Sequence, residues 1–438
     1  MKFTDNLIKA RSYIVFILGL VVAFSAIIWI EAKSGFALSP SGPAITASPE
    51  RQGLRTPRLL NERERQWAQV AWKYFENNGD PVTGLPGSVD KFPSATMWDT
   101  GSYLLAVISA QQLNLIDRSE FDRRISAALA SLGKLPLFDE QLPNKAYNTQ
   151  TLQMTDYTNK PSVRGLGWSV IDIGRVLVPL NVLVWQHPQH AEAARAVIAR
   201  WNVARLTRDG VLFGARVDQA GKTELVQEGR LGYEQYAAKT FSLMGLDVTA
   251  SSNYTRQLAT VDIYGIQVGH DRRLPRLFGA QNYVISEPYV LDGLEFGWDS
   301  VSRELAWRVY LAQQRRFERT GMLTAVTEDH IDQKPYFVYN TVFSDGKAWN
   351  TTTENGDDAS AFRTLSVKAA FGWYALLDTD YTHKLVDAVA PLNDAKRGWY
   401  GGQYETTGKP NTSINANTNA VVLQSMAFIE KGPFIRYH

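Results

Sequence analysis

Amphipathic helical patterns recur along residues 61–438 without a linker-like segment between them, and this regularity most limits the possible folds. Asn61 and Glu64 indicate the start of the first helix, because their spacing is that of a capping box. Apolar residues then repeat at helical intervals: Trp67, Val70, Ala71, Tyr74 and Phe75. An amphipathic helix is therefore expected at the start of the globular part of the chain.

The same kind of pattern predicts about eleven helices in all. After the first, they are expected near residues 97–114, 119–133, 166–185, 190–203, 231–243, 288–296, 299–320, 360–377, 380–389 and 417–430. Two strand-like excursions, at 211–227 and 321–349, interrupt the series. No βαβ alternation or Gly-rich phosphate loop is present, which argues against nucleotide-binding folds.

About a dozen helices in one uninterrupted domain favour a mainly α fold, an (α/α)6 toroid built as a double ring of about twelve helices with small β excursions. A helical solenoid is the alternative, but it would normally show a sequence repeat, and none is found. In a toroid, the loops at one mouth line a funnel. Such a funnel suits long polymers.

An uncharged run from Tyr13 to Ile30 precedes this domain and has the length of a membrane-spanning helix. Because Lys2, Lys9 and Arg11 come before it, the positive-inside rule places the N-terminus in the cytoplasm of a bacterial cell. We therefore expect a single-pass inner-membrane protein whose main domain is periplasmic. The expected parts are a cytoplasmic tip and transmembrane anchor (1–31), a flexible periplasmic linker (32–60) and the toroid (61–438).

A cleaved signal peptide is the alternative interpretation of the same run. The run is longer than a usual signal-peptide core, although Ala37 and its small neighbours could serve a peptidase.

Composition excludes several classes of function. The chain has no Cys, which removes disulfides, thiolate nucleophiles and thiolate metal sites, and its net charge of +2 with scattered basic residues argues against nucleic acid as a partner. His187 and His190 are separated by Pro188, which spoils a helical zinc spacing. No metal and no cofactor are therefore expected, and the sequence identifies no protein partner.

Carboxylates stand beside aromatic residues or Gly at five places, mostly at predicted helix starts. A sugar has apolar faces and a rim of hydroxyls, so its binding site needs aromatic rings beside carboxylates and amides. Cleavage of a glycosidic bond needs two carboxyl groups, one protonated and one ionised. The candidate carboxylates are Asp99, Asp172, Glu234, Glu287, Glu354 and Asp358.

Each candidate also has a purely structural interpretation. Asp99 and Asp358 occupy positions suited to helix N-caps, and Glu287 before Pro288 could simply interact with a helix dipole. Asp172 lies among apolar residues, where a carboxylate must be hydrogen-bonded or functional. The acidic run 354–358 could be a solvated loop or a calcium site, although its spacing is not that of an EF-hand.

Four stretches carry a resemblance to a bacterial family known only as a domain of unknown function. They are NKAYN at 144–148, GWSVIDIGR at 167–175, KAAFGW at 368–373, and GWYGGQYE at 398–405 followed by NTNA at 417–420. The resemblance covers nearly all of residues 61–438. That family in turn resembles glycoamylase-like proteins and endo-β-1,2-glucanases, which have (α/α)6 toroids and act on glucans.

The resemblance implies a proton donor at Glu234, in the sequence Tyr233-Glu234-Gln235-Tyr236. Asp99 or Glu354 would then be the base or nucleophile. Aromatic rings, carboxylates and an amide would bind the substrate: Trp98, Tyr147, Trp168, Asp172, Glu287, Asp358, Tyr404 and Asn417.

The expected function is a periplasmic glycoside hydrolase or transglycosylase acting on an exported bacterial polysaccharide or glucan. Its partners would be the polysaccharide and, through one helix, the inner membrane. The alternative is a non-catalytic glycan-binding component of a polysaccharide export or phage-receptor system. A polysaccharide lyase on the same fold is a third possibility, although only six His residues are available for its usual base chemistry.

Overall fold

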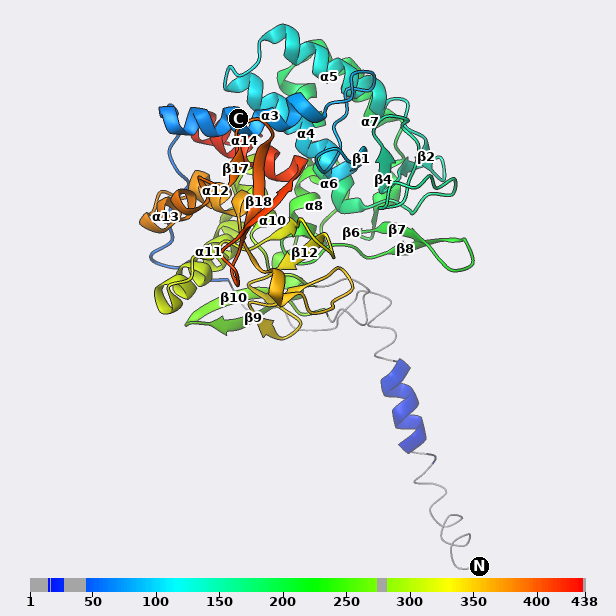
Figure 1. The fold of residues 1–438 in the computed structure, drawn as a ribbon. Helices are drawn as coiled ribbons and strands as arrows, with labels where there is room; N and C mark the ends of the chain where they lie inside the picture. Colours follow the sequence, from blue (N-terminus) through cyan, green and yellow to red (C-terminus); the bar gives the residue numbers. More distant parts are fainter. Residues whose placement is uncertain (1–14, 16, 27–44, 274–281, 436–438) are drawn as a thin grey trace, which may run out of the picture.

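The structure is a computed structural model that describes residues 15, 17–26, 45–273 and 282–435. Its globular part is built around a closed ring of six inner helices, each of which contacts the next (Figure 1). In ring order they are α4 (Met97–Gln112), α6 (Val170–Gln186), α8 (Tyr233–Leu243), α10 (Glu287–Phe296), α12 (Val367–Leu376) and α14 (Ala416–Lys431), which returns to contact α4. The mainly α toroid predicted from the helical periodicity is confirmed.

Outer helices alternate with the inner ones along the chain. They are α3 (Glu62–Asn78), α5 (Arg118–Leu132), α7 (Pro188–Ala199), α11 (Ser300–Thr320) and α13 (Asp380–Val389). Between α8 and α10, the described residues instead form a 3-10 turn, η2 (Tyr254–Gln257), and a hairpin of β9 (Leu258–Ile263) and β10 (Ile266–Asp271) that packs on α11. The capping box predicted at Asn61 and Glu64 opens α3.

The sequence of the inner helices explains their position. All but the last two residues of α4 are buried, and so is every residue of α10 and α12, as expected of helices that pack on all sides. Gly101 lets α4 approach α6 closely, because a Cβ there would lie 2.9 Å from the Val176 Cα. Gly174 does the same between α6 and α8, where a Cβ would lie 2.8 Å from the Ala237 Cβ. A closed ring of this width requires such small residues at its contacts.

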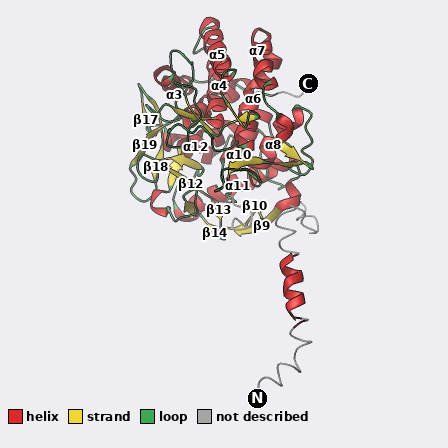
Figure 2. Cartoon of the chain, turned by 90° about the vertical axis from the view of Figure 1, so that its right-hand side faces the viewer, coloured by secondary structure: helices red, strands yellow, loops and turns green. Residues whose placement is uncertain are grey.

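Long connections enter the inner helices, and short ones leave them. The segments after α4, α6, α10 and α12 have no more than five residues, the longest being 113–117. The strands lie mostly in the connections that precede inner helices, gathered on one side of the helical ring (Figure 2). The N-terminal ends of the inner helices therefore form the mouth of the toroid, where loops and strands can build a site.

Short antiparallel sheets make up this mouth. The strands before α8 are β1 (Ser94–Thr96), β2 (Leu137–Phe138), β3 (Leu142–Pro143), β4 (Ala146–Asn148), β5 (Thr207–Arg208), β6 (Val211–Leu212), β7 (Gly214–Val217) and β8 (Thr223–Val226). Those before α12 are β11 (Glu328–His330), β12 (Phe337–Asn340), β13 (Phe343–Ser344), β14 (Lys347–Ala348), β15 (Thr351–Thr352) and β16 (Thr364–Ser366). Those before α14 are β17 (Asn393–Asp394), β18 (Gly398–Tyr404) and β19 (Pro410–Ile414). The two predicted strand-like excursions are confirmed.

The predicted linker is partly ordered against the toroid. Within residues 45–60, the Ser48 backbone N–H and hydroxyl donate to Glu304 at 3.0 and 2.6 Å, and the Arg55 guanidinium donates to the Tyr374 carbonyl at 2.8 Å. Arg58 pairs with Glu64 of α3. A flexible linker is therefore wrong for residues 45–60, because polar side chains that looked solvated in the sequence meet buried partners far along the chain. Residues 32–44 lie outside the described part.

The predicted membrane span falls partly outside the described residues. Of residues 13–30, the structure describes 15 and 17–26, and the latter are helical with exposed side chains. No helix in the described part of the chain has both the length and the apolar character that a bilayer crossing requires.

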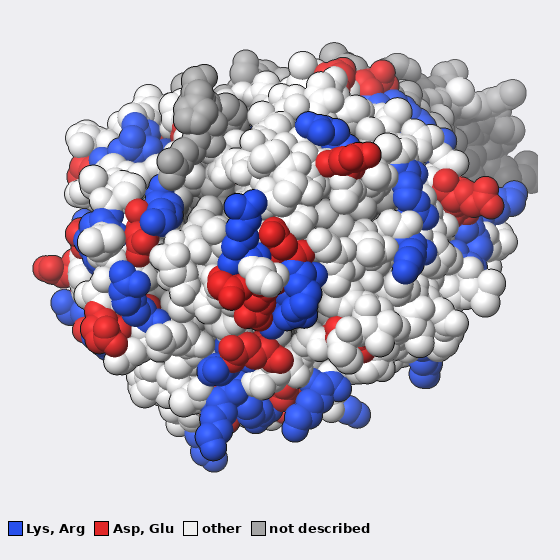
Figure 3. Space-filling model, turned by 90° about the horizontal axis from the view of Figure 1, so that it is seen from above, with Lys and Arg blue, Asp and Glu red and all other residues white. Residues whose placement is uncertain are grey.

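On the face of the toroid seen from above, basic and acidic side chains lie next to one another (Figure 3).

Candidate active site

The first turns of all six inner helices converge at the mouth, and each contributes a polar side chain. In ring order these side chains are Asp99, Asp172, Tyr233, Glu287, Lys368 and Asn417. Helix N-termini carry partial positive charge, so six of them at one place stabilise negative charge there. The mouth is therefore a site where several carboxylates can be kept close together.

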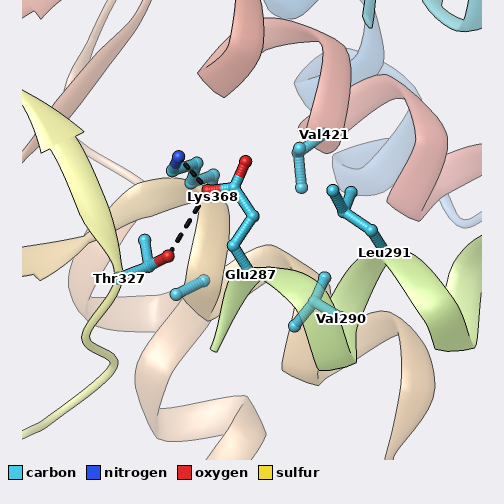
Figure 4. Close-up of a pocket in the computed structure, with 7 residues that line it drawn as sticks. Glu287, Val290, Leu291, Thr327, Lys368 and Val421 are labelled. Atoms are coloured by element: carbon cyan, nitrogen blue, oxygen red, sulfur yellow. Dashed lines mark hydrogen bonds and ion pairs between the residues drawn. The ribbon is translucent and has the colours of Figure 1, made fainter. Parts of the chain in front are cut away.

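The Glu287 carboxylate lies at the centre of this group, and Figure 4 shows it beside Lys368 and Thr327. Its carboxylate pairs with the Lys368 ammonium and accepts a 2.6 Å hydrogen bond from the Asn417 amide, while the Thr327 hydroxyl lies 3.4 Å away. Burial alone would lower the pKa of Lys368, but carboxylates at Glu287, Glu328 and Asp329 together raise it. Lys368 is thus a permanent cation among the acids.

Glu287 also lines a small space of about 10 Å³, together with Val290, Leu291, Ala369 and Val421. Such a volume is about that of a single water-sized sphere. This space is therefore too small for a sugar.

A second network, of buried hydrogen bonds and an ion pair, fixes the orientation of Asn417. The Ser102 hydroxyl donates to the Asn417 side-chain oxygen at 3.1 Å, and Arg175 donates to the same hydroxyl at 3.4 Å. Arg175 in turn pairs with Glu295, which accepts a 2.7 Å hydrogen bond from the Tyr236 hydroxyl. This chain of contacts orients the Asn417 amide so that its N–H group points at Glu287.

Glu328, on β11, is a partly accessible carboxyl with an unusual charge environment. Burial, together with the neighbouring negative charge of Glu287, raises the pKa of Glu328 to about 8, against smaller opposing effects of Lys368 and Tyr233. At neutral pH this group holds a proton. A protonated carboxyl at a mouth lined by acids has the property that a general acid needs.

Asp172, in the first turn of α6, is also partly accessible. Burial and the adjacent Glu228 raise the pKa of Asp172 to about 7, against a hydrogen bond from the Ser169 hydroxyl at 3.0 Å. Glu228 itself is held by the Lys145 ammonium at 3.3 Å and by the Val170 backbone N–H at 2.8 Å. The charge of Asp172 also raises the pKa of Glu328, by less than burial and Glu287 do.

Asp99 combines the two roles that the sequence left open. Its carboxylate accepts hydrogen bonds from the Thr96 backbone N–H and hydroxyl at 3.0 and 2.9 Å, which completes a capping box at the start of α4. Burial raises its pKa, and it interacts electrostatically with Lys368, Glu287 and Asp172. The N-cap of α4 is thus Thr96 and not Asp99, which as the third residue of the helix completes the capping box and contributes to the charge of the site.

Tyrosines lie beside the carboxyls. Tyr157 is 55% exposed, and its hydroxyl interacts electrostatically with Asp172 and Glu354. Tyr339 lies directly across the sheet from Glu328 and stacks on Tyr283 with 3.9 Å between ring centroids. These rings give the mouth the aromatic surfaces that a sugar-binding site needs.

The proton donor that the resemblance implied, Glu234, lies in the first turn of α8, next to Tyr233, and is held by an arginine. It is only 4% exposed; one carboxylate oxygen lies 2.7 Å from Arg273, and the other accepts from the Ser251 hydroxyl at 2.8 Å. Arg273 also pairs with Asp271. Both oxygens are thus occupied by protein donors, and a role in proton transfer would require this cluster to open.

The four predicted aromatic platforms differ from the expectation. Trp168 and Tyr147 are buried in the core, with hydrogen bonds to the Phe213 and Pro136 carbonyls at 3.1 and 2.7 Å. Tyr404 is buried in a small separate cluster and donates to Asp332 at 2.6 Å. These three present no open ring face for a sugar. Trp98 is 9% exposed and packs edge-on against Tyr233 with 5.6 Å between centroids, so it lies at the floor of the site.

The two remaining candidates lie in an exposed loop. Glu354 is solvent-exposed but interacts electrostatically with Tyr157 and Tyr339, at the rim of the mouth. The Asp358 carboxylate accepts hydrogen bonds from the backbone N–H and the hydroxyl of the nearby Ser360, at 3.4 and 3.1 Å. Within the described ranges, no group of three or more His, Asp or Glu side chains has the geometry of a metal site.

Sequence reasoning missed Glu328, Lys368, Glu228 and Tyr157. Glu328 lies in a strand of only three residues, so neither helix starts nor aromatic motifs mark it. Lys368 was visible, because a cation in the second position of an otherwise apolar helix is unusual and implies a buried partner.

The fold is similar to those of several solved structures. Endo-beta-1,2-glucanase from Chitinophaga pinensis, in complex with sophorotriose and glucose, matches with a TM-score of 0.58 and 12% identity over 85% of this chain and 94% of that one. A mutant endo-beta-1,2-glucanase from Talaromyces funiculosus, in complex with beta-1,2-glucan, matches with a TM-score of 0.56 and 12% identity over 85% of this chain and 84% of that one. A structure from Bacteroides caccae, provisionally assigned as a glucoamylase, matches with a TM-score of 0.60 and 12% identity over 84% of this chain and 93% of that one.

At such low identity these similarities establish the fold alone. No curated protein matches the sequence. The sequence model of a family of proteins of unknown function matches residues 66–432, most of the toroid. The chain therefore belongs to this family, DUF3131.

Proposed function

We propose that this protein is a glycoside hydrolase or transglycosylase that acts on a bacterial polysaccharide or glucan by carboxylate acid and base chemistry. The observation that carries the proposal is the pair of partly accessible carboxyls, Glu328 and Asp172, whose pKa values are raised to about 8 and about 7 at a mouth lined with tyrosines. Glycosidic cleavage needs one carboxyl that still holds its proton beside one that has lost it.

In the proposed mechanism, Glu328 donates its proton to the leaving glycosidic oxygen. Asp172 is the more acidic of the pair and lies at a helix N-terminus, where the helix dipole favours its ionised form. It acts as the base toward water, or as the group that stabilises the positive charge developing on the sugar. Glu287 and Lys368, already paired, hold the charge balance of the site constant while these groups exchange protons.

Tyrosines position the sugar in this mechanism. Tyr157 offers an exposed ring beside Asp172, and Tyr233 and Tyr339 adjoin Glu328. A ring stacked on one sugar face leaves the hydroxyl rim free for the carboxylates. The solved β-1,2-glucanases of the same fold make neutral glucans, and β-1,2-glucan first among them, the substrates to test.

Location is part of the proposal. The uncharged run 13–30, preceded by basic residues, would anchor the chain in the inner membrane and place the toroid in the periplasm. There it would meet polysaccharide in transit. Reporter fusions after residue 60 test this: activity of a reporter that works only in the cytoplasm would contradict it.

The activity is tested by incubating the full chain with linear β-1,2-, β-1,3- and β-1,4-glucans and with exported bacterial polysaccharides, and measuring new reducing ends. We expect chain shortening with at least one glucan and its loss in Glu328→Gln. Tight binding without any cleavage would instead support the glycan-binding alternative.

A further inference from the structure

Aromatic rings line one face of the small sheet β11–β12–β15, beginning beside Glu328, the proposed acid. In the antiparallel pairing of β11 and β12, Glu328 lies opposite Tyr339, and His330 lies opposite Phe337. Side chains of opposed residues share a face of the sheet. These four are all partly exposed, whereas Asp329 and Val338, on the other face, are buried.

The rings on this face touch in series. His330 meets Phe337 edge-on at 5.0 Å between centroids, Phe337 meets Tyr339 at 5.3 Å, and Tyr339 stacks on Tyr283 at 3.9 Å. Successive cross-strand pairs on one face are about 7 Å apart along a strand. The series therefore starts at Glu328 and extends the site outward by roughly the length of a further sugar. We call His330, Phe337, Tyr339 and Tyr283 the aromatic strip.

The strip has little charge. Burial, with a smaller contribution from Lys368, lowers the pKa of His330 to about 4, so its imidazole is neutral at physiological pH. At neutral pH the charged carboxylate that acts on Tyr339 of the strip is Glu354, because Glu328 holds its proton, and Lys368 is already paired with Glu287. A polysaccharide rich in uronic acids would be repelled by Glu354, whereas a neutral chain would not.

We propose that the aromatic strip binds the chain of a neutral, linear polysaccharide beyond the cleavage point, so that the protein acts on the interior of long chains. This inference rests on the proposed function for the position of cleavage, but its binding component does not. The rings of the strip contact one another and begin beside the carboxyl that would donate the proton. Such a row can bind several successive sugars of a chain, rather than a single terminal sugar.

The test compares Phe337→Ala and Phe337→Leu with a matched control, Trp185→Ala. Phe337→Leu keeps the apolar bulk of the sheet but removes the ring, so a result shared by both variants reflects stacking rather than loss of packing. Trp185 is a 50% exposed aromatic near the C-terminal end of α6, opposite the mouth. Melting temperatures identify any variant that fails to fold.

Binding is measured first, by retardation of the full chain in gels containing linear β-1,2-, β-1,3- or β-1,4-glucan, with Glu328→Gln as the background that prevents cleavage. Both Phe337 variants should weaken retardation by the best-binding glucan about 3- to 10-fold, the range expected of one aromatic contact. The control should be unchanged, and polygalacturonate should give no retardation.

Turnover is measured next on the polymer and on short oligosaccharides of the same linkage. The Phe337 variants should raise KM for the polymer and leave kcat/KM for the shortest cleaved oligosaccharide unchanged. If the Phe337 variants lose kcat/KM equally on the polymer and on the short oligosaccharide, or if their retardation in the gel is unchanged, the inference is overturned while the proposed function stays intact. Phe337-dependent retardation without any cleavage supports the strip and contradicts the hydrolase. Stronger retardation by polygalacturonate, or none by any neutral glucan, overturns the strip.

Discussion

Two clusters of carboxylates lie near the mouth-side ends of the inner helices, and they differ in their cations. Around Glu234, two carboxylates share Arg273, and hydrogen-bond donors from the protein occupy the oxygens of Glu234. Around Glu328, Lys368 is the cation for several carboxylates, among them Asp99 and Glu287. The first cluster is satisfied within the protein, and the second retains a proton at neutral pH. The partners of a carboxylate, more than its position at a helix start, thus decide its role.

The largest effect is expected from removing the proton at the second cluster. Glu328→Gln keeps the shape of the side chain but cannot donate a carboxyl proton, so turnover should fall on the order of 10²–10⁴-fold. Reducing-end assays on the cleaved glucan measure the loss, and circular dichroism checks the fold. Near-normal turnover would exclude Glu328 as the acid.

The first cluster should respond in stability rather than in chemistry. Glu234→Gln leaves the guanidinium of Arg273 with one carboxylate fewer, and breaking a buried ion pair typically costs about 3–5 kcal/mol of unfolding free energy. Chemical denaturation measures this cost. Turnover per folded molecule should change little; if it instead drops by orders of magnitude with stability unchanged, the donor is Glu234, as the family resemblance implies.

A pH profile sharpens the contrast between the clusters. Activity should need Glu328 protonated and Asp172 ionised, so kcat/KM should rise as pH increases through about 7 and fall as it increases through about 8. The two limbs belong to the coupled pair. Asp172→Asn should abolish the lower limb along with most activity. A profile flat from pH 5 to 9 would contradict these assignments.

The smallest expected effect is on stability. A carboxyl whose pKa is raised on folding keeps its proton in the native state after the unfolded chain has lost it, so stability falls as pH rises from about 4 through the native pKa. Asp172→Asn should therefore melt at a higher temperature than the wild type at pH 8.5, with little difference at pH 4. The reverse order at pH 8.5 would show that Asp172 is stabilised as an anion.

Much of the fold was predictable from local pattern. The apolar periodicity of residues 97–114 and 299–320 predicted α4 and α11 to within two residues, because helix boundaries are set by nearby caps such as Asp299. The helix expected at 360–377 begins only at Val367, because Thr364–Ser366 pairs with β18, a partner distant in sequence.

The site was only half predictable. Asp172, Glu287 and Asn417 stood at helix starts and are brought together there. Trp168, Tyr147 and Tyr404 were expected to stack on sugars but are buried, since local sequence does not show whether an aromatic ring faces the core or the mouth. Glu328 depends on a strand pairing and on charges from three other elements, which no local pattern contains.

The central claim is that a carboxyl at the mouth, Glu328, holds a proton at neutral pH. Infrared spectroscopy detects the carbonyl stretch of protonated carboxyl groups directly and can be recorded for the wild type and for Glu328→Gln at pH 7. The account predicts that Glu328→Gln removes intensity from this band. A band of unchanged intensity in Glu328→Gln would contradict the account.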